Sequence, residues 1–274
     1  MSGGTAPGKV LKITSHANPR VKAVKALALA KHRKETGQFL VEGLKLVTDA
    51  LSEGWTVRAM IHEERAIEQP AIAKAAAAAR IAGADILSVT AEILGKITRR
   101  DNPQTVIGVV DQRLADPNAL AASGEVVVAL EQVRDPGNLG TIIRTADAVG
   151  AGGIILVGPS VDPFSIEAVR ATMGSLFHVP LVRMSEERFL DFARSWRGPV
   201  VGTHLKGSVD YREAAYEPPV LLVMGNEQSG LTDAVAGACS TLVRIPMAGQ
   251  ADSLNLAVST AVMLYEIKRD QLSL

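Results

Sequence analysis

The sequence predicts an α/β protein whose C-terminal half is a doubly wound parallel sheet. Three observations support this prediction. From residue 125 onwards, short runs rich in Val, Ile and Leu alternate with segments of helical periodicity. These runs are apolar on both faces, as the strands of a parallel sheet covered by helices on each side must be. Residues 13–113 show the same alternation on a smaller scale, which indicates a second, smaller α/β domain at the N-terminus.

The N-terminal half begins with residues 1–12, which we expect to form a flexible tail. Residues 18–37 are expected to form one helix that ends at Gly37. The apolar residues of this helix recur near one face: Val21, Val24, Leu27 and Leu29. The remaining expected elements alternate along the chain: strand 38–43, helix 44–54, strand 56–63, helix 69–83, strand 85–90, helix 91–98 and strand 105–112.

Residues 114–124 are polar and rich in small residues, and we place the domain linker there. The strand–helix pattern restarts after this linker, so residues 125–274 are expected to form the second domain. Its elements follow in order: strand 126–130, helix 139–150, strand 153–158, helix 165–174, strand 181–184, helix 187–196, strands 199–205 and 219–225, helix 231–239, strand 241–247 and helix 254–270.

Charge and cysteine content restrict the classes of function. The net charge is zero, which argues against a generic polyanion binder. The stretch from Lys9 to Lys34 nevertheless holds basic residues and no acid, and it fits either phosphate contacts or a solvated helix face. The single cysteine, Cys239, excludes an intrachain disulfide and a cysteine-based zinc cluster, and we expect no metal site. With no signal peptide or membrane-spanning run expected, this composition suits a cytoplasmic protein.

The turn 135–140 follows the first strand of the second domain, where a Rossmann unit carries its phosphate loop. That fingerprint needs three glycines and a ribose-binding acid, whereas this turn has only Gly137 and Gly140 and no such acid follows. No P-loop sequence occurs either, so a nucleotide-dependent oxidoreductase is disfavoured. Asn138 is expected to cap the following helix. Arg144, in the second turn of that helix, is either an exposed surface residue or a functional one.

Two later passages repeat the arrangement of strand, polar turn and helix. In 221–231 an acid, Glu227, follows the strand, and Gly225 and Gly230 permit close backbone approach or positive φ. In 245–266 the loop contains Ser253, which alone would be an ordinary helix N-cap. Carboxyl ends of parallel strands lie at one edge of a sheet, where α/β folds bind ligands. We therefore expect the three polar turns to meet there.

These passages resemble the three motifs of the SpoU (TrmH-type) RNA ribose 2′-O-methyltransferases, which belong to the knotted SPOUT superfamily. The matching stretches are "NLGTIIRTADAVGA" (138–151), "LLVMGNEQSGL" (221–231) and "IPMAGQADSLNLAVSTA" (245–261). The N-terminal half resembles the substrate-binding domain that often precedes them, a small RNA-binding ribosomal-protein fold, through "NPRVKAVKAL" and "GQFLVEGLKLV".

The resemblance implies a deep trefoil knot, S-adenosyl-L-methionine as the cofactor, and a homodimer formed through the knotted domain. It also implies an RNA substrate, with large-subunit ribosomal RNA favoured over transfer RNA. The catalytic residues that it implies are Asn138, Arg144, Glu227, Ser253 and Asn255. The cofactor-binding residues that it implies are Thr203, His204, Leu205, Gly225, Asn226, Glu227, Ile245, Met247, Ser253 and Leu254. A satisfied loop histidine remains the alternative for His204.

Candidate RNA contacts come from cations outside these motifs. They are Arg20 and Lys22 of the N-terminal basic stretch, Arg99, Arg100 and Arg170. Each of these residues taken alone also fits an ordinary surface cation. Aromatic residues are scarce, so base stacking is not expected to dominate RNA recognition.

Methyl transfer from a sulfonium is an in-line displacement, and the attacking 2′-hydroxyl must lose its proton. Arg144 is expected near that hydroxyl, either as a general base or as a charged group that binds phosphate and stabilises the alkoxide. We prefer the second role because a guanidinium stays protonated at neutral pH. Asn138 would orient the substrate or Arg144, and Glu227 would hold Arg144 or an RNA hydroxyl. Alternatives are an inactive RNA-binding or ribosome-assembly protein on the same fold, and a base methylase.

Overall fold

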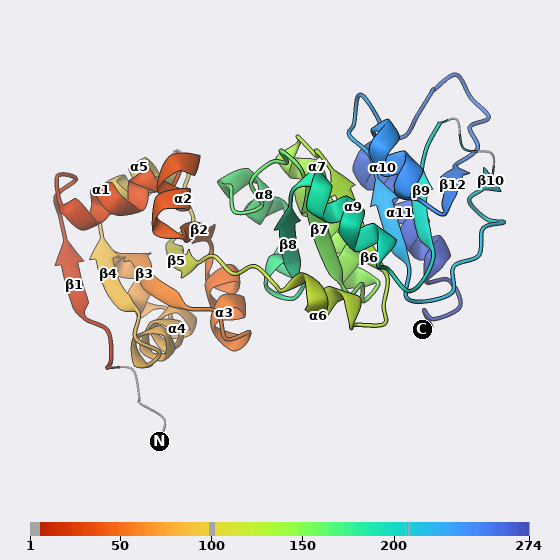
Figure 1. The fold of residues 1–274 in the computed structure, drawn as a ribbon. Coiled ribbons are helices and arrows are strands. Elements are labelled where there is room, and N and C mark those ends of the chain that lie inside the picture. The colour runs from red at the N-terminus through yellow and green to blue at the C-terminus, as the bar shows by residue number, and fades with distance from the viewer. Residues whose placement is uncertain (1–5, 99–101, 206, 208, 274) are drawn as a thin grey trace. The chain divides into compact units, whose positions relative to one another are not determined.

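The computed structural model describes residues 6–98, 102–205, 207 and 209–273 of the chain. They form two compact α/β units (Figure 1). Unit 1 runs to Arg113 and takes in Phe164–Phe177, and unit 2 comprises Leu114–Pro163 and His178–Leu274. None of the helices in the described ranges combines the length and the apolar character that crossing a bilayer requires.

Unit 1 is built on a five-stranded sheet with the strand order β1-β4-β3-β5-β2. Strands β1, β4 and β3 run parallel, and β5 is antiparallel to both β3 and β2. The strands are β1 (Val10–Ile13), β2 (Gln38–Glu42), β3 (Val57–Glu63), β4 (Asp85–Val89) and β5 (Val106–Asp111). The helices are α1 (Pro19–Ala26), α2 (Ala30–Thr36), α3 (Leu44–Ser52), η1 (Glu64–Glu68), α4 (Pro70–Ile81), α5 (Ala91–Thr98), α8 (Ile166–Ala171) and η2 (Ser175–Phe177).

Two predictions for unit 1 are wrong in part. Residues 1–12 were expected to form a flexible tail, but Val10–Ile13 form strand β1, which pairs with β4 and buries Ile13. The helix expected over 18–37 is two helices with a break at Leu27–Leu29. Arg33 is buried and donates from Nη1 to the carbonyls of Leu27 (2.9 Å) and Ala28 (3.1 Å). These bonds satisfy two carbonyls that the break removes from the helical ladder.

Unit 2 contains a seven-stranded sheet in the order β10-β12-β9-β11-β6-β7-β8, and all its strand pairings are parallel. The strands are β6 (Val127–Glu131), β7 (Gly153–Val157), β8 (Leu181–Met184), β9 (Val200–Thr203), β10 (Val209–Asp210), β11 (Leu221–Met224) and β12 (Thr241–Arg244). The helices are α6 (Pro117–Ala121), α7 (Pro136–Ala148), α9 (Glu186–Arg194), α10 (Asp233–Ala238) and α11 (Leu256–Ile267).

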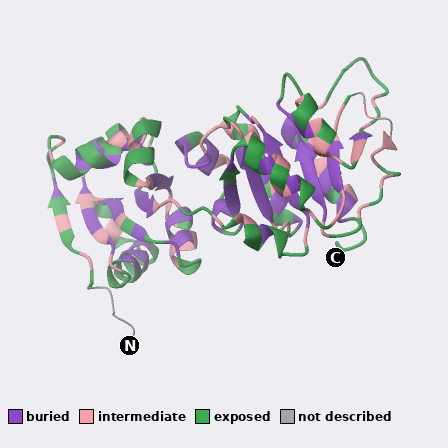
Figure 2. Cartoon of the chain, viewed as in Figure 1, coloured by how far each residue is buried: buried purple, intermediate pink, exposed green. Residues whose placement is uncertain are grey.

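The two faces of this sheet are covered by different helices. Residues of α6, α9 and α10 share one core cluster with Val127, Ala129 and their neighbours in β7, β8 and β11. Because side chains alternate along a strand, Val128 and Leu130 face the other side, and α7 packs beside α11. Strands β6, β7 and β11 are buried along their whole length (Figure 2). The predicted doubly wound parallel sheet is confirmed, and the trefoil knot stays a prediction.

Residues 164–177 lie between two stretches of unit 2 but pack in unit 1. The ring of Phe164 lies 4.9 Å from that of Phe39, and Phe177 lies 5.3 Å from Trp55. Arg170 donates to Glu42 from Nη2 to both carboxylate oxygens, each at 2.7 Å, and from Nε to Oε2 at 3.1 Å. The expected domain boundaries, 13–113 and 125–274, assign residues 164–177 to the second domain. The sequence does not reveal that this segment packs in unit 1, because a short amphipathic helix has the same pattern whichever core it covers.

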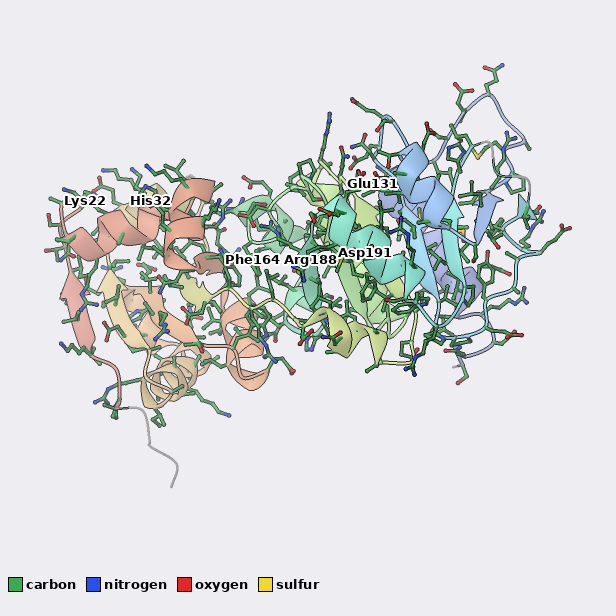
Figure 3. The ribbon with its side chains drawn as sticks, in the orientation of Figure 1. Lys22, His32, Glu131, Phe164, Arg188 and Asp191 are labelled. Carbon is green, nitrogen blue, oxygen red and sulfur yellow. The ribbon has the colours of Figure 1, made fainter. Side chains whose placement is uncertain are left out.

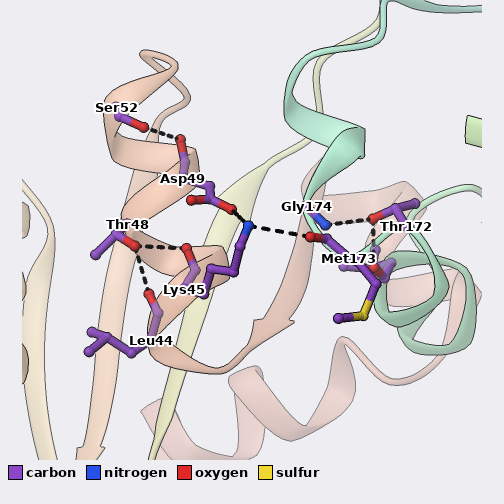
Figure 4. Close-up of polar contacts among 9 residues, drawn as sticks. Leu44, Lys45, Thr48, Asp49, Ser52, Thr172, Met173 and Gly174 are labelled. Atoms are coloured by element: carbon purple, nitrogen blue, oxygen red, sulfur yellow. Dashed lines mark hydrogen bonds and ion pairs between the residues drawn. The ribbon is translucent and has the colours of Figure 1, made fainter. Parts of the chain in front are cut away.

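A polar contact fixes the end of the same segment (Figure 4). Lys45 on α3 donates from Nζ to Asp49 at 2.5 Å and to the carbonyl of Met173 at 3.4 Å. Met173 is followed by Gly174, whose φ is +109°, and a Cβ there would lie 2.7 Å from the Asp49 carboxylate. Only glycine fits this close approach without displacing the ion pair.

Candidate functional site

The three polar turns meet at one edge of the unit 2 sheet, as predicted. Strands β6, β11, β9 and β12 run parallel, so their carboxyl ends share this edge. The turn at 132–138 follows β6, the loop 225–231 follows β11, and the loop 245–255 follows β12. Side chains far apart in the sequence are therefore close together at the edge where α/β folds bind ligands.

The loop 225–231 is a compact turn closed on itself. Asn226 and Gly230 exchange backbone hydrogen bonds of 3.0 Å in both directions. The buried side chain of Asn226 accepts the N–H groups of Gln228 (2.9 Å) and Ser229 (3.2 Å) on Oδ1. A Cβ on Gly225 would lie 2.2 Å from the carbonyl carbon of Gly230, whose φ is +70°. The predicted need for glycine at both positions is confirmed.

Hydrogen bonds join one residue from each motif. Asn138 donates from Nδ2 to Oε1 of Glu227 at 3.2 Å. Asn255 donates from Nδ2 to Oδ1 of Asn138 at 2.9 Å. Glu227 also accepts the backbone N–H groups of Arg134 and Asp135 at 3.4 Å. The Glu227 carboxylate therefore anchors the start of α7 to the loop 225–231. The Asn138 amide is hydrogen-bonded through both its nitrogen, to Glu227, and its oxygen, to Asn255.

The helix cap predicted at Asn138 is wrong, and so is the alternative interpretation of Ser253 as an ordinary cap. The N-cap of α7 is Asp135, whose Oδ1 accepts the N–H of Asn138 at 2.6 Å. The N-cap of α11 is Asn255, whose Oδ1 accepts the N–H groups of Ala257 and Val258. Each helix has a choice of capping residues within three positions, and contacts with the rest of the site decide between them. Asn138 is consequently free of a capping role and its side chain binds Glu227 and Asn255.

A cavity of about 460 Å³ opens between the loops 203–205, 224–231 and 243–259. All ten residues that the sequence suggested for cofactor binding line it: Thr203, His204, Leu205, Gly225, Asn226, Glu227, Ile245, Met247, Ser253 and Leu254. Further lining residues were not foreseen, among them Met224, Leu231, Asp233, Val243, Arg244 and Asp252. The lining combines apolar side chains with a few charged ones, as small-molecule sites do.

Arg144 differs from Asn138, Glu227 and Asn255 in having no partner among the described residues. It is exposed on α7, and no hydrogen bond or ion pair joins it to any residue in the described ranges. It lies six residues beyond Asn138, about 9 Å along the helix axis. Glu227, which was expected to hold either Arg144 or an RNA hydroxyl, is bound instead to Asn138 and the backbone of residues 134–135.

Three of the predicted RNA contacts, Arg20, Lys22 and Arg170, are among the described residues of unit 1 and differ in their interactions. Arg20 forms an ion pair with Asp85, and Arg170 forms an ion pair with Glu42, whose side chain is 3% exposed. Lys22 projects from the exposed face of α1 (Figure 3) and pairs with no acid within the described residues. Arg99 and Arg100 lie outside the described residues.

Two residues at the end of β6 belong to the site and were not foreseen. Glu131 is buried and accepts the N–H of Thr232 on Oε2 at 3.0 Å. Gln132 has a φ of +50° and its carbonyl accepts Nδ2 of Asn226 at 2.7 Å. A glutamate at the end of an apolar strand is only a weak indication of a functional site in the sequence, and nothing in the sequence indicates a left-handed glutamine.

No group of three His, Cys, Asp or Glu side chains placed to hold a metal ion occurs in the part of the chain that the structure describes.

Comparison with protein families assigns both halves of the chain. The model of the SpoU rRNA Methylase family matches residues 125–265, and that of the MRM3-like substrate binding domain matches residues 18–108. The 23S rRNA (guanosine(2553)-2′-O)-methyltransferase RlmP of Bacillus subtilis is 32% identical over 258 residues, which cover 94% of this chain and 99% of the relative. The 23S rRNA (uridine(2479)-2′-O)-methyltransferase of Streptomyces viridochromogenes is 33% identical over 273 residues, 96% and 93% of the two chains.

Solved structures agree with these matches. The AdoMet-bound rRNA methyltransferase from Sinorhizobium meliloti superposes with a TM-score of 0.91 at 50% identity, over 97% of this chain and 100% of that one. The SpoU methyltransferase AviRb from Streptomyces viridochromogenes, in complex with AdoMet, superposes with a TM-score of 0.85 at 30% identity, over 93% and 99%.

Proposed function

Because the chain belongs to the SpoU rRNA Methylase family, we propose that it methylates a ribose 2′-hydroxyl of large-subunit ribosomal RNA with S-adenosyl-L-methionine. The observation that carries this proposal is the meeting of all three motifs at one sheet edge, where hydrogen bonds join the first motif to the second and third, which line the cavity. The alternative of an inactive RNA-binding protein is disfavoured, because the residues that the chemistry needs are all present and hydrogen bonds join Asn138, Glu227 and Asn255.

The cavity fits the parts of the cofactor. Leu205, Ile245, Met247 and Leu254 offer apolar walls suited to an adenine ring, and Gly225 lines the cavity beside them. Glu227, Asp233 and Asp252 place carboxylates around the lining, which suit an ammonium group and ribose hydroxyls. When bound, S-adenosyl-L-methionine supplies an electrophilic sulfonium methyl group.

The residues of this chain would hold and activate the RNA. Arg144 is proposed to bind the phosphate beside the target ribose and to stabilise the negative charge that develops on the 2′-oxygen. Because no described residue binds Arg144, its five N–H donors are available for a phosphate. Asn138, held between Glu227 and Asn255, is proposed to fix the start of α7 and thereby the position of Arg144.

Unit 1 is proposed to bind the RNA substrate. Residues 18–108 match a substrate-binding domain, and α1 exposes Lys22 and Lys25 without acidic partners in the described residues. Arg20, Arg99, Arg100 and Arg170 remain proposed contacts. The salt bridges of Arg20 and Arg170 mean that RNA phosphate would have to compete with Asp85 and Glu42. A cytoplasmic location is proposed because that is where ribosomal RNA is found.

We propose a homodimer formed through unit 2. Helices α7 and α11 lie side by side, and α11 carries an outward stripe at positions 258, 261, 262 and 265. Within it Val258 is 49% exposed and Tyr265 is 52% exposed. An exposed apolar stripe at helical spacing is typical of an interface between subunits. Arg144 on α7 would then lie beside this interface.

Mapping ribose methylation over all ribosomal RNA tests the proposal. Cells lacking the gene are expected to lose the 2′-O-methyl group at one nucleotide of the large-subunit RNA and to regain it with the wild-type chain. Purified protein should transfer a radiolabelled methyl group to RNA from the deletion strain and not to RNA from the parent. Methylation of a base at the recovered site, or of transfer RNA alone, would contradict the proposal.

A further inference from the structure

Two irregular residues follow each other at the carboxyl end of β6. The first, Glu131, is 1% exposed (labelled in Figure 3). Its Oε2 accepts the N–H of Thr232 at 3.0 Å, while no donor in the described residues reaches its Oε1. Burying a carboxyl oxygen without a hydrogen bond is unfavourable, and natural proteins keep few such groups. A role that requires this side chain would explain why it is kept.

The second residue, Gln132, has a φ of +50°, in the left-handed region that non-glycine residues seldom adopt. Its N–H still donates to the carbonyl of Val157 at 2.9 Å, so it extends the pairing between β6 and β7. The left-handed turn then directs its carbonyl to Nδ2 of Asn226 at 2.7 Å. Strained backbone of this kind persists where surrounding contacts require it, often at functional sites.

Both irregular residues hold the same loop at its two ends. Gln132 binds Asn226 at the beginning, and Glu131 binds Thr232 at the end. Between these points Asn226 collects the N–H groups of Gln228 and Ser229 on its own side chain. The loop residues from Gly225 to Leu231 line the cavity, whereas Glu131 and Gln132 do not. Their effect on the cavity therefore passes through the loop.

We propose that Glu131 and Gln132 are positioning residues that hold the loop 226–232 in its cofactor-binding shape before the cofactor arrives. A loop ordered in advance loses little conformational entropy on binding, so affinity rises without a new contact to the ligand. The cost of one unpaired carboxyl oxygen and one strained residue is offset by this preorganisation. The inference rests on the proposed use of S-adenosyl-L-methionine and adds two residues to the machinery of that site.

Variants of Glu131 test the acceptor at the end of the loop. Glu131→Leu removes the acceptor of the Thr232 N–H, and we expect the Kd for S-adenosyl-L-methionine, measured by calorimetry, to rise at least tenfold. The KM for the cofactor should rise in parallel, while kcat at saturating cofactor stays within about twofold. Glu131→Gln keeps an oxygen in place and should restore the Kd to within about threefold of wild type. A wild-type Kd for Glu131→Leu would overturn the proposal.

Variants of Gln132 test the backbone with little change in packing, since the residue is partly exposed. Gln132→Gly accommodates a φ of +50° and should bind the cofactor like wild type. Gln132→Val disfavours that conformation and should raise the Kd severalfold. Equal Kd values for these two variants would contradict the role of Gln132, and this holds even if Glu131→Leu fails to fold.

Glu125→Gln provides the matched control. Glu125 lies just before the same strand at its other end and accepts Nζ of the buried Lys268 at 2.5 Å. Loss of the Glu125 carboxylate should lower the melting temperature without changing the Kd for the cofactor. If Glu125→Gln raised this Kd as much as Glu131→Leu does, the effect of Glu131 would be one of general stability and not of positioning the loop. If the wild-type chain itself binds no S-adenosyl-L-methionine, the proposed function fails instead, so the two failures are distinguishable.

Discussion

Asn255 and Asn138 lie 117 positions apart in the sequence, and a hydrogen bond of 2.9 Å joins their side chains. The Nδ2 of Asn255 donates to Asn138, while its Oδ1 caps α11 by accepting the N–H groups of Ala257 and Val258. One amide therefore performs a structural task with its oxygen and connects two motifs with its nitrogen. The two tasks can be separated by substitution.

Asn255→Asp is expected to keep the cap and lose the connection. A carboxylate oxygen caps a helix as well as an amide oxygen does, so the melting temperature should stay close to wild type. The donor to Asn138 disappears, and turning the Asn138 amide would place its oxygen against Glu227. We expect kcat/KM for RNA to fall about tenfold or more, which is about 1.4 kcal/mol. Asn255→Ala should in addition lose about 1 kcal/mol of stability. Full activity of the Asp variant would show that the connection is dispensable.

Arg144→Lys tests whether the planar guanidinium is required. A lysine keeps the charge and cannot bind a phosphate with two parallel N–H donors. We expect kcat to fall roughly 10- to 100-fold, with the Kd for S-adenosyl-L-methionine unchanged because Arg144 does not line the cavity. Arg188→Lys on α9 is the control, an exposed arginine without an acidic partner among the described residues (Figure 3). Near-normal turnover of Arg144→Lys would exclude the bidentate role.

The ion pair of Glu42 with Arg170 is expected to hold residues 164–177 in unit 1. Arg170→Met would leave the carboxylate of Glu42, 3% exposed, without its partner. Removing one member of a buried pair costs about 3–5 kcal/mol. Urea unfolding should report this loss, and the double variant Glu42→Leu with Arg170→Met should recover part of it. A double variant less stable than Arg170→Met alone would contradict this account.

Asp85→Asn is expected to destabilise unit 1 in a pH-dependent way. The backbone N–H of Lys9, 2.9 Å from Oδ1, and the guanidinium of Arg20 hold the pKa of Asp85 below its usual range. A carboxyl with a lowered pKa contributes stability above its unfolded pKa of about 3.9 and loses it as the pH falls further. The melting temperature of the variant should be lower than wild type at pH 7, and the gap should shrink towards pH 3.

The control for this pH series is Asp191→Asn. Asp191 pairs with Arg194 on the surface of α9, where both side chains are about 70% exposed. Such pairs contribute little, so this variant should melt like wild type at every pH. A gap for Asp85→Asn that is as large at pH 3 as at pH 7 would show that the carboxylate charge is not its cause.

Val258→Glu tests the proposed dimer. Placing a charge on the apolar stripe of α11 should convert the protein from dimer to monomer in sedimentation or light-scattering measurements. Leu114→Glu, which alters an exposed apolar residue of unit 2 outside that stripe, should leave the mass unchanged. A wild-type chain that is monomeric at micromolar concentration would refute the dimer directly.

Much of this protein could be predicted from the order of its residues. Apolar runs alternating with helical segments predicted the parallel sheet, because burial on both faces of a strand leaves a continuous pattern in the sequence. The loops after β6, β11 and β12 could be placed together, since parallel strands bring their carboxyl ends to one edge. The ten cofactor residues that the family resemblance implied follow β9, β11 and β12, and they line one cavity at this edge.

Other features depend on contacts between distant segments and leave no local pattern. Arg33 closes the break at Leu27–Leu29 by binding two carbonyls, and Phe39 and Glu42 hold residues 164–177 in unit 1. Local propensity permitted a cap at Asn138, but Glu227 and Asn255 engage that side chain and Asp135 serves instead. The left-handed Gln132 is stabilised by Asn226, 94 positions further on. The sequence by itself determined which segments fold and where they converge, because burial and strand direction follow from local sequence patterns. Only the tertiary structure decided which polar group binds which, because that depends on the neighbours that folding brings together.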